Sequence, residues 1–254
     1  MILSMNILEA LFPQHQGSVA LIGGGGKTSV MRWGAQIAKQ QQKNLWLTTT
    51  TKILQSSPIE AEHWHNAGTP PPSDGQWLWT GGSTAEGKKW TGPSLMALER
   101  GRIRVPEPPL PPLLIEADGS AGCPIKVPGL GEPVVPSWCT MVAVLVGLSA
   151  LGKPAGPETL HRWPQAQEIL SLKQDEPFTK NHLKTLLAHP EGSFRATPPE
   201  AKKILILNQS DALFGKTREA KELAEFIAKS SSFLHGILIT SLATDEKIQH
   251  MITP

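Results

Sequence analysis

The chain has 254 residues, of which 39% are hydrophobic and 18% are charged. This composition excludes a disordered chain and a chain built mainly of membrane spans. The net charge of +2, from 24 basic and 22 acidic residues, creates no field that would attract a polyanion, so we expect no nucleic-acid partner. Residues 1–6 lack a signal peptide's basic flank, and no apolar run reaches roughly 18 residues, so we expect a cytoplasmic protein without a membrane segment.

Strands and helices alternate along the predicted chain. Short apolar runs predict strands at 18–22, 44–48, 76–80, 113–115, 141–148, 203–207 and 236–240. Apolar spacing and helix-start residues predict helices at 28–40, 94–100, 165–172, 179–188 and 217–229. This order predicts a single three-layer α/β domain over residues 1–254, in which helices cover both faces of a mostly parallel sheet, as in P-loop NTPases.

Three segments are less regular. Residues 55–75 carry four prolines and predict a long surface excursion, and residues 105–112 predict a proline-rich connector. A more polar insertion lies near 150–200, where we expect specificity for a client or second substrate. Neither the histidines nor the two cysteines, Cys123 and Cys139, show the spacing of a zinc site or a disulfide framework, so we expect no structural zinc and two small, buried thiols.

The strongest motif follows the first predicted strand and opens the first long helix. It consists of Gly23, Gly24, Gly25, Gly26, Lys27 and Thr28. Glycines allow successive backbone N–H groups to face one anion, and the start of a helix adds partial positive charge. The motif therefore predicts a phosphate site, extended by Ser29, in which Lys27 contacts the terminal phosphates and Thr28 ligates Mg²⁺. Leu21 stands where the usual pattern has its first glycine, which indicates a shortened loop.

Glu116 and Asp118 follow the predicted strand at 113–115, and alternation directs both carboxylates to one side. We expect one to hold Mg²⁺ or its bound water and the other to orient the attacking water, and the sequence does not assign which does which. Together with Lys27 they form the predicted catalytic set, and together with Thr28 the predicted metal ligands. A solvated pair of acids in a turn is the alternative.

Two further polar segments follow predicted strands. Asn208 and Asp211 belong to an Asn-Gln-Ser-Asp box that resembles the guanine-recognition box of GTPases. A carboxylate accepts both N–H groups of the guanine edge, so Asp211 favours GTP over ATP, although a simple turn is the alternative. The threonine run ending at Thr50 and Thr51 is expected to meet the terminal phosphate or its metal, and a β-prone strand end explains it nearly as well.

These motifs occur together in a known family. Its boxes match, in order, Gly23–Thr28, Thr48–Lys52, Glu116–Ser120, Lys126 with Glu132–Pro136, His161–Arg162 and Leu207–Asp211. Over about residues 17–211 the chain resembles the YqeC-type selenium-dependent hydroxylase accessory proteins. The resemblance implies a P-loop-type protein that helps to mature a selenium-dependent molybdenum hydroxylase. It also makes Lys126 and His161 members of the site, although Trp163-Pro164 departs from the family's usual Pro-Glu.

Three functions remain open from the sequence. The first is a Mg²⁺-dependent nucleoside-triphosphatase that acts on a client, with GTP favoured over ATP. The second is an ATP-dependent ligase or small-molecule kinase, because a loop without the early glycine also resembles that of Mur-type ligases. The third is a nucleotide-gated binding module without appreciable turnover.

Overall fold

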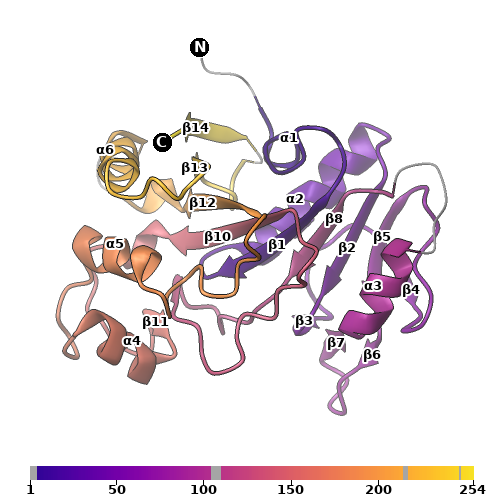
Figure 1. The fold of residues 1–254 in the computed structure, drawn as a ribbon, viewed down its shortest axis with the longest axis horizontal. Coiled ribbons are helices and arrows are strands. Elements are labelled where there is room, and N and C mark those ends of the chain that lie inside the picture. The colour runs from indigo at the N-terminus through magenta and orange to yellow at the C-terminus, as the bar shows by residue number, and fades with distance from the viewer. Residues whose placement is uncertain (1–4, 104–109, 214–216, 246) are drawn as a thin grey trace.

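The computed structural model describes residues 5–103, 110–213, 217–245 and 247–254. A nine-stranded sheet crosses the molecule, with helices against both of its faces (Figure 1). In spatial order its strands are β14 (Ile248–Ile252), β13 (Gly236–Thr240), β12 (Lys202–Asn208), β10 (Met141–Gly147), β1 (Ser18–Gly23), β8 (Leu113–Glu116), β2 (Leu45–Thr49), β5 (Gln76–Thr80) and β4 (Glu62–His65). All neighbours are parallel except β13 and β14. The predicted α/β class with a mostly parallel sheet is confirmed.

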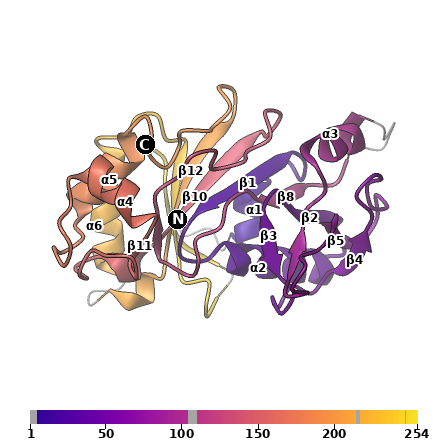
Figure 2. The same ribbon diagram turned by 90° about the horizontal axis from the view of Figure 1, so that it is seen from below.

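Helices divide between the two faces of the sheet. They are α1 (Ile7–Leu11), α2 (Lys27–Gln40), α3 (Leu95–Ile103), α4 (Trp163–Leu170), α5 (Lys180–Ala188) and α6 (Thr217–Ala228), with single 3₁₀ turns η1 (Leu148–Ala150) and η2 (Ser210–Ala212). Val19 and Leu21 of β1 belong to one core with α1 and α2, whereas Ala20 and Ile22 belong to the other core, with α4, α5 and α6. Figure 2 shows α4, α5 and α6 grouped at the end of the molecule opposite α3.

Central strands are recognisable in the sequence because they are buried on both faces. Every residue of β10 is buried, and its run Met-Val-Ala-Val-Leu-Val-Gly contains no polar side chain. Parallel strands between two helical layers have this composition because neither face meets water. The central strands thus carry the chain to one edge of the sheet, where the segments that follow β1, β8, β10 and β12 lie side by side.

Several short elements lie outside the predicted set. A three-stranded antiparallel sheet pairs β3 (Lys52–Leu54) with β7 (Lys89–Thr91) and β7 with β6 (Gly82–Ser83). A two-residue parallel pair joins β9 (Ile125–Lys126) to β11 (Leu160–His161). The predicted excursion at 55–75 contains β4, which pairs with β5 at the edge of the main sheet. Its strand was missed because Glu62–His65 is mostly exposed and has no apolar pattern.

Other expectations differ in detail. Of the predicted connector at 105–112, residues 105–109 lie outside the described residues, and Leu110, Pro111 and Pro112 lead into β8. Cys123 and Cys139 are both buried, as predicted. Within the part of the chain that the structure describes, no helix has the length and apolar character needed to cross a membrane.

Candidate phosphate-loop site

The glycine loop connects β1 to α2 in the middle of the sheet's carboxyl edge. Gly26 caps α2 with φ of 139°, and a Cβ there would lie 2.3 Å from Asn208 Nδ2. A Cβ at Gly25 would lie 2.5 Å from the backbone of Gly147, at the end of β10. Only glycine allows this conformation and this close approach. The loop is therefore packed tightly against neighbouring strand ends, while the first N–H groups of α2 have no partner within the helix.

Lys27 is buried at the start of α2, with 5% of its surface exposed. Its Nζ lies 3.0 Å from Asp118 Oδ1 and also donates a hydrogen bond to the carbonyl of Gly23. The second carboxylate oxygen of Asp118 accepts a hydrogen bond of 3.0 Å from the Gly23 N–H. Asp118 therefore holds both the lysine and the first residue of the loop in place.

Glu116 ends β8, and it is 7% exposed. Its Oε2 is buried without a hydrogen-bond partner among the described residues. Burial, together with the charge of Asp118, raises the pKa of Glu116 to about 7, although the charge of Lys27 acts in the opposite direction. Buried carboxyl groups with a raised pKa and an oxygen without a hydrogen bond are typical of functional sites.

A chain of alternating charges continues from Asp118 to the surface. Lys126 has a fully buried side chain whose Nζ lies 3.9 Å from Asp118 Oδ2 and 2.9 Å from Glu132 Oε2. Glu132 in turn pairs with Arg162 at 2.9 Å. Although burial raises the pKa of Glu132, hydrogen bonds from Arg162 and Lys126 outweigh it and hold that pKa at about 2. His161 lies beside Lys126 in the β9–β11 pair, where burial and the charges of Lys126 and Arg162 lower its pKa.

The loop opens into a cavity of about 370 Å³. It is lined by Gly25, Gly26, Lys27, Thr28, Lys52, Ile53, Leu54, Ser57, Lys89, Glu116, Gly119, Ser120, Ala121, Gly122 and Gln209. Of the residues predicted from the sequence, the structure places Gly25, Gly26, Lys27, Thr28 and Glu116 in this lining. Backbone donors, a lysine and a carboxylate around one concave space are suited to an anion and the cation that accompanies it.

The remaining predicted residues lie around this cavity rather than in its lining. Gly23 and Gly24 form the base of the loop, Ser29 lies in the first turn of α2, and Asp118, Lys126 and His161 form the charge chain beside it. The hydroxyl of Thr50 donates to the carbonyl of Val134 at 2.8 Å, and Thr51 exchanges a hydrogen bond with Thr49. The threonine run thus fastens the end of β2 to its neighbours.

Asn208 is a bridge between three strand ends. Its Nδ2 donates to the Gly25 carbonyl at 2.7 Å, and its Oδ1 accepts from Leu242 N at 2.8 Å and from Thr240 Oγ1 at 3.0 Å. Asp211, in η2, is exposed and accepts a hydrogen bond from Ser241 Oγ. The predicted base box is therefore joined to the loop through Asn208, while Asp211 faces solvent beside the end of β13.

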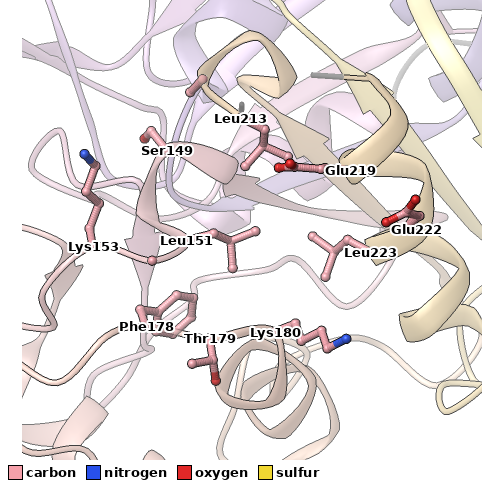
Figure 3. Close-up of a pocket in the computed structure, with 12 residues that line it drawn as sticks. Ser149, Leu151, Lys153, Phe178, Thr179, Lys180, Leu213, Glu219, Glu222 and Leu223 are labelled. Atoms are coloured by element: carbon pink, nitrogen blue, oxygen red, sulfur yellow. The ribbon is translucent and has the colours of Figure 1, made fainter. Parts of the chain in front are cut away.

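A second cavity of about 570 Å³ lies on the α5 and α6 side of the sheet (Figure 3). Phe178, Leu151 and Leu223 form its apolar part, and Lys153 stands on the opposite side from Glu222 of α6. This cavity is larger, but the charged groups of the loop do not line it. A hydrogen bond of 2.6 Å joins the two linings, because Ser149 Oγ, in the second lining, donates to Gln209 Oε1, in the first.

Lys89 was missed by the sequence analysis. It lies in β7, more than 60 residues after the loop, and only the pairing of β7 with β3 brings it to the cavity. No local motif marks it, because a turn precedes it and it does not follow a strand of the main sheet. Lys52 belongs to the Thr48–Lys52 box of the sequence, although only Thr50 and Thr51 of that box were predicted to lie in the site.

Comparison with known proteins locates these residues within one family. The family model described as "YqeC protein" matches residues 19–164, which include the loop, both acids and the whole charge chain. The Escherichia coli (strain K12) protein described as "Uncharacterized protein YqeC" is 30% identical over 204 residues, an alignment that covers 75% of this chain and 75% of that protein. The Asn208–Asp211 box lies beyond the segment that the family model matches.

Proposed function

The chain belongs to the YqeC family, and from this premise and the geometry of the loop we propose that it binds a Mg²⁺-bound nucleoside triphosphate and hydrolyses it. One observation carries the proposal. The glycine loop, the buried Lys27 and Glu116, whose buried Oε2 has no hydrogen-bond partner among the described residues, line a single cavity at the carboxyl edge of a parallel sheet. Ligands of open α/β sheets bind at this edge.

Each residue has a defined task in this proposal. The N–H groups at the start of α2 bind the phosphate chain, and Lys27 neutralises charge on the terminal phosphoryl group. Thr28 and Glu116 fit Mg²⁺, because both line the cavity and Glu116 has a carboxylate oxygen without a partner. Mg²⁺ would neutralise phosphate charge and polarise the reacting phosphorus. Asp118 positions Lys27 and the loop, because both of its oxygens already contact them.

Guanine is the favoured base in this proposal. Asn208 ties the base box to the loop, so a nucleotide with its phosphates in the loop extends toward η2. The hydroxyl of Ser241 orients Asp211, which leaves the second carboxylate oxygen for the N–H groups of a guanine. The resemblance to selenium-dependent hydroxylase accessory proteins supplies the biological part of the proposal, in which hydrolysis serves maturation of a molybdenum hydroxylase client. The cavity of Figure 3 is our proposed place for specificity toward that client.

Calorimetric titration with GTP and with ATP in Mg²⁺ tests the nucleotide site. We expect GTP to bind more tightly, Lys27→Ala to abolish binding, and Asp211→Ala to reduce the preference for GTP. Lys39→Ala, at the exposed end of the same helix, and Asp245→Ala, an exposed acid beyond β13, are matched controls that should bind as the wild type does.

The outcomes separate the candidate functions. Binding of ATP alone would reject the guanine assignment, and binding without phosphate release in a malachite-green assay would reject hydrolysis in favour of a nucleotide-gated binding module. If neither nucleotide binds, the proposed function is wrong.

A further inference from the structure

We propose that Lys52, Leu54 and Lys89 form a subsite for a small organic anion, a carboxylate or a phosphate ester, that accepts the terminal phosphoryl group of the nucleotide. This inference rests on the proposed nucleotide site and adds a second substrate, which takes the phosphoryl group that water takes in hydrolysis. The three residues come from β3 and β7 of the small antiparallel sheet and line the same cavity as Lys27 and Glu116.

The order of the strands indicates how a nucleotide would lie along the cavity. Gln209, after β12, lies two strands to one side of β1, and Lys52, just after β2, lies two strands to the other. A nucleotide whose base lies near the end of β12 therefore points its terminal phosphate past Glu116 toward Lys52. The attacking group must approach that phosphate from the far side, which is where the small sheet stands.

Register places both lysines on one face of the small sheet. Lys52 and Leu54 are two residues apart on β3, and Lys89 pairs with Leu54 across the ladder. Residues at these positions point to the same side, whereas Ile53 between them is 2% exposed and faces the core. One face of the small sheet thus carries two cations beside a leucine, and all three residues line the cavity.

Charge favours an anionic occupant. Lys27 is already paired with Asp118, but neither Lys52 nor Lys89 makes an ion pair within 4.0 Å among the described residues. Glu116 is the one acid among the described residues that line the cavity. The charge of Lys89 acts on Glu116 without an ion pair, so both lysines can still contact an added anion.

Leu54 indicates that the anion has an apolar part. Its side chain is 52% exposed at the cavity wall, between the two lysines. In the reaction, an oxygen of the acceptor anion attacks the terminal phosphorus, and the bond from that phosphorus to the bridging oxygen breaks. The bond's electron pair leaves with the nucleoside diphosphate, and the product is an acyl phosphate or a phosphoric anhydride. No proton has to be removed from an anionic acceptor.

NMR titration of the full chain with pentanoate, and separately with inorganic phosphate, tests the subsite. The protein is saturated with GDP and Mg²⁺, so that the glycine loop is filled. We expect the Lys52→Met/Lys89→Met variant to bind both probes at least about tenfold more weakly, a loss of about 1.4 kcal/mol in binding free energy, because both cationic contacts to the anion are removed. Leu54→Ser should weaken pentanoate only. Lys88→Met, the adjacent exposed lysine outside the lining, is the matched control and should leave both affinities unchanged.

The outcomes distinguish this inference from the proposed function. If GDP binds but the double variant and Lys88→Met bind the probes equally, the subsite is refuted while the nucleotide site stands. If the double variant loses affinity for GTP alone, the lysines are ligands of the terminal phosphate and the acceptor subsite is again refuted. If GDP does not bind, the proposed function fails. Titration of the nucleotide-free protein with the same probes, in a Lys27→Ala background, still measures whether Lys52 and Lys89 bind an anion.

Discussion

Replacing Glu116 with glutamine should stabilise the protein at alkaline pH. The fold raises the pKa of this carboxyl group from 4.5 to about 7, so the folded protein binds its proton more tightly than the unfolded chain does. Stability then falls as the pH rises from 4.5 to 7, and the cost is complete above pH 7. A difference of two to three pKa units corresponds to about 3 kcal/mol.

Urea denaturation at pH 4, 6 and 8 measures this cost. Glu116→Gln should exceed the wild type in free energy of unfolding by up to about 3 kcal/mol at pH 8, and by almost nothing at pH 4. Glu86→Gln, on the exposed turn before β7, controls for loss of a surface carboxylate and should follow the wild type throughout. If the free energy of unfolding of wild type and of Glu116→Gln depended on pH in the same way, the raised pKa of the buried Glu116 carboxyl group would be refuted.

Three further changes test the packing of the site. Glu132→Gln removes a partner of both Lys126 and Arg162. Because the fold lowers the pKa of Glu132, the stabilisation that its carboxylate provides is present above about pH 4.5 and is lost toward pH 2. Thermal melting should therefore show the variant to be less stable than the wild type at pH 7 and similar to it at pH 2, and an equal deficit at both pH values would contradict this. Asn208→Ala leaves three buried groups without partners and should cost about 2 to 4 kcal/mol in urea, whereas a change below about 1 kcal/mol would show that the bridge is unimportant. Gly26→Ala should abolish GTP binding in calorimetry, and wild-type affinity would show that the loop tolerates a Cβ.

Burial determined which strands the sequence could predict. β10 and β12 are central, so they appear as continuous apolar runs. β9 and β11 have two residues each and form only because their segments meet in space. β4 and β14 lie at the edges of the sheet, and the exposed residues of β4 include the polar Glu62 and His65. Edge and two-residue strands depend on tertiary pairing, which leaves no periodic pattern.

The same distinction, between central strands and elements that depend on tertiary pairing, applies to the residues of the site. Lys27, Glu116 and Asp118 were predictable because each directly follows a central strand, and parallel strands deliver such residues to one edge. The ion pair of Lys27 with Asp118 was not predictable, because the sequence places both near the phosphate without showing that they contact each other. Lys89 was out of reach altogether, since a separate small sheet carries it to the cavity.

The buried charges at this edge support one another rather than the fold as a whole. Lys126 is fully buried, and a lone ammonium there would cost several kcal/mol. Asp118 and Glu132 offset that cost on either side, and Arg162 compensates Glu132 where the chain of charges reaches solvent. Replacing buried ion pairs with well-packed apolar residues is often neutral or stabilising in proteins, so stability alone does not explain these charges. Their consequence is positional: Asp118, with Lys126 on its other side, holds both Lys27 at the start of α2 and Gly23 at the end of β1.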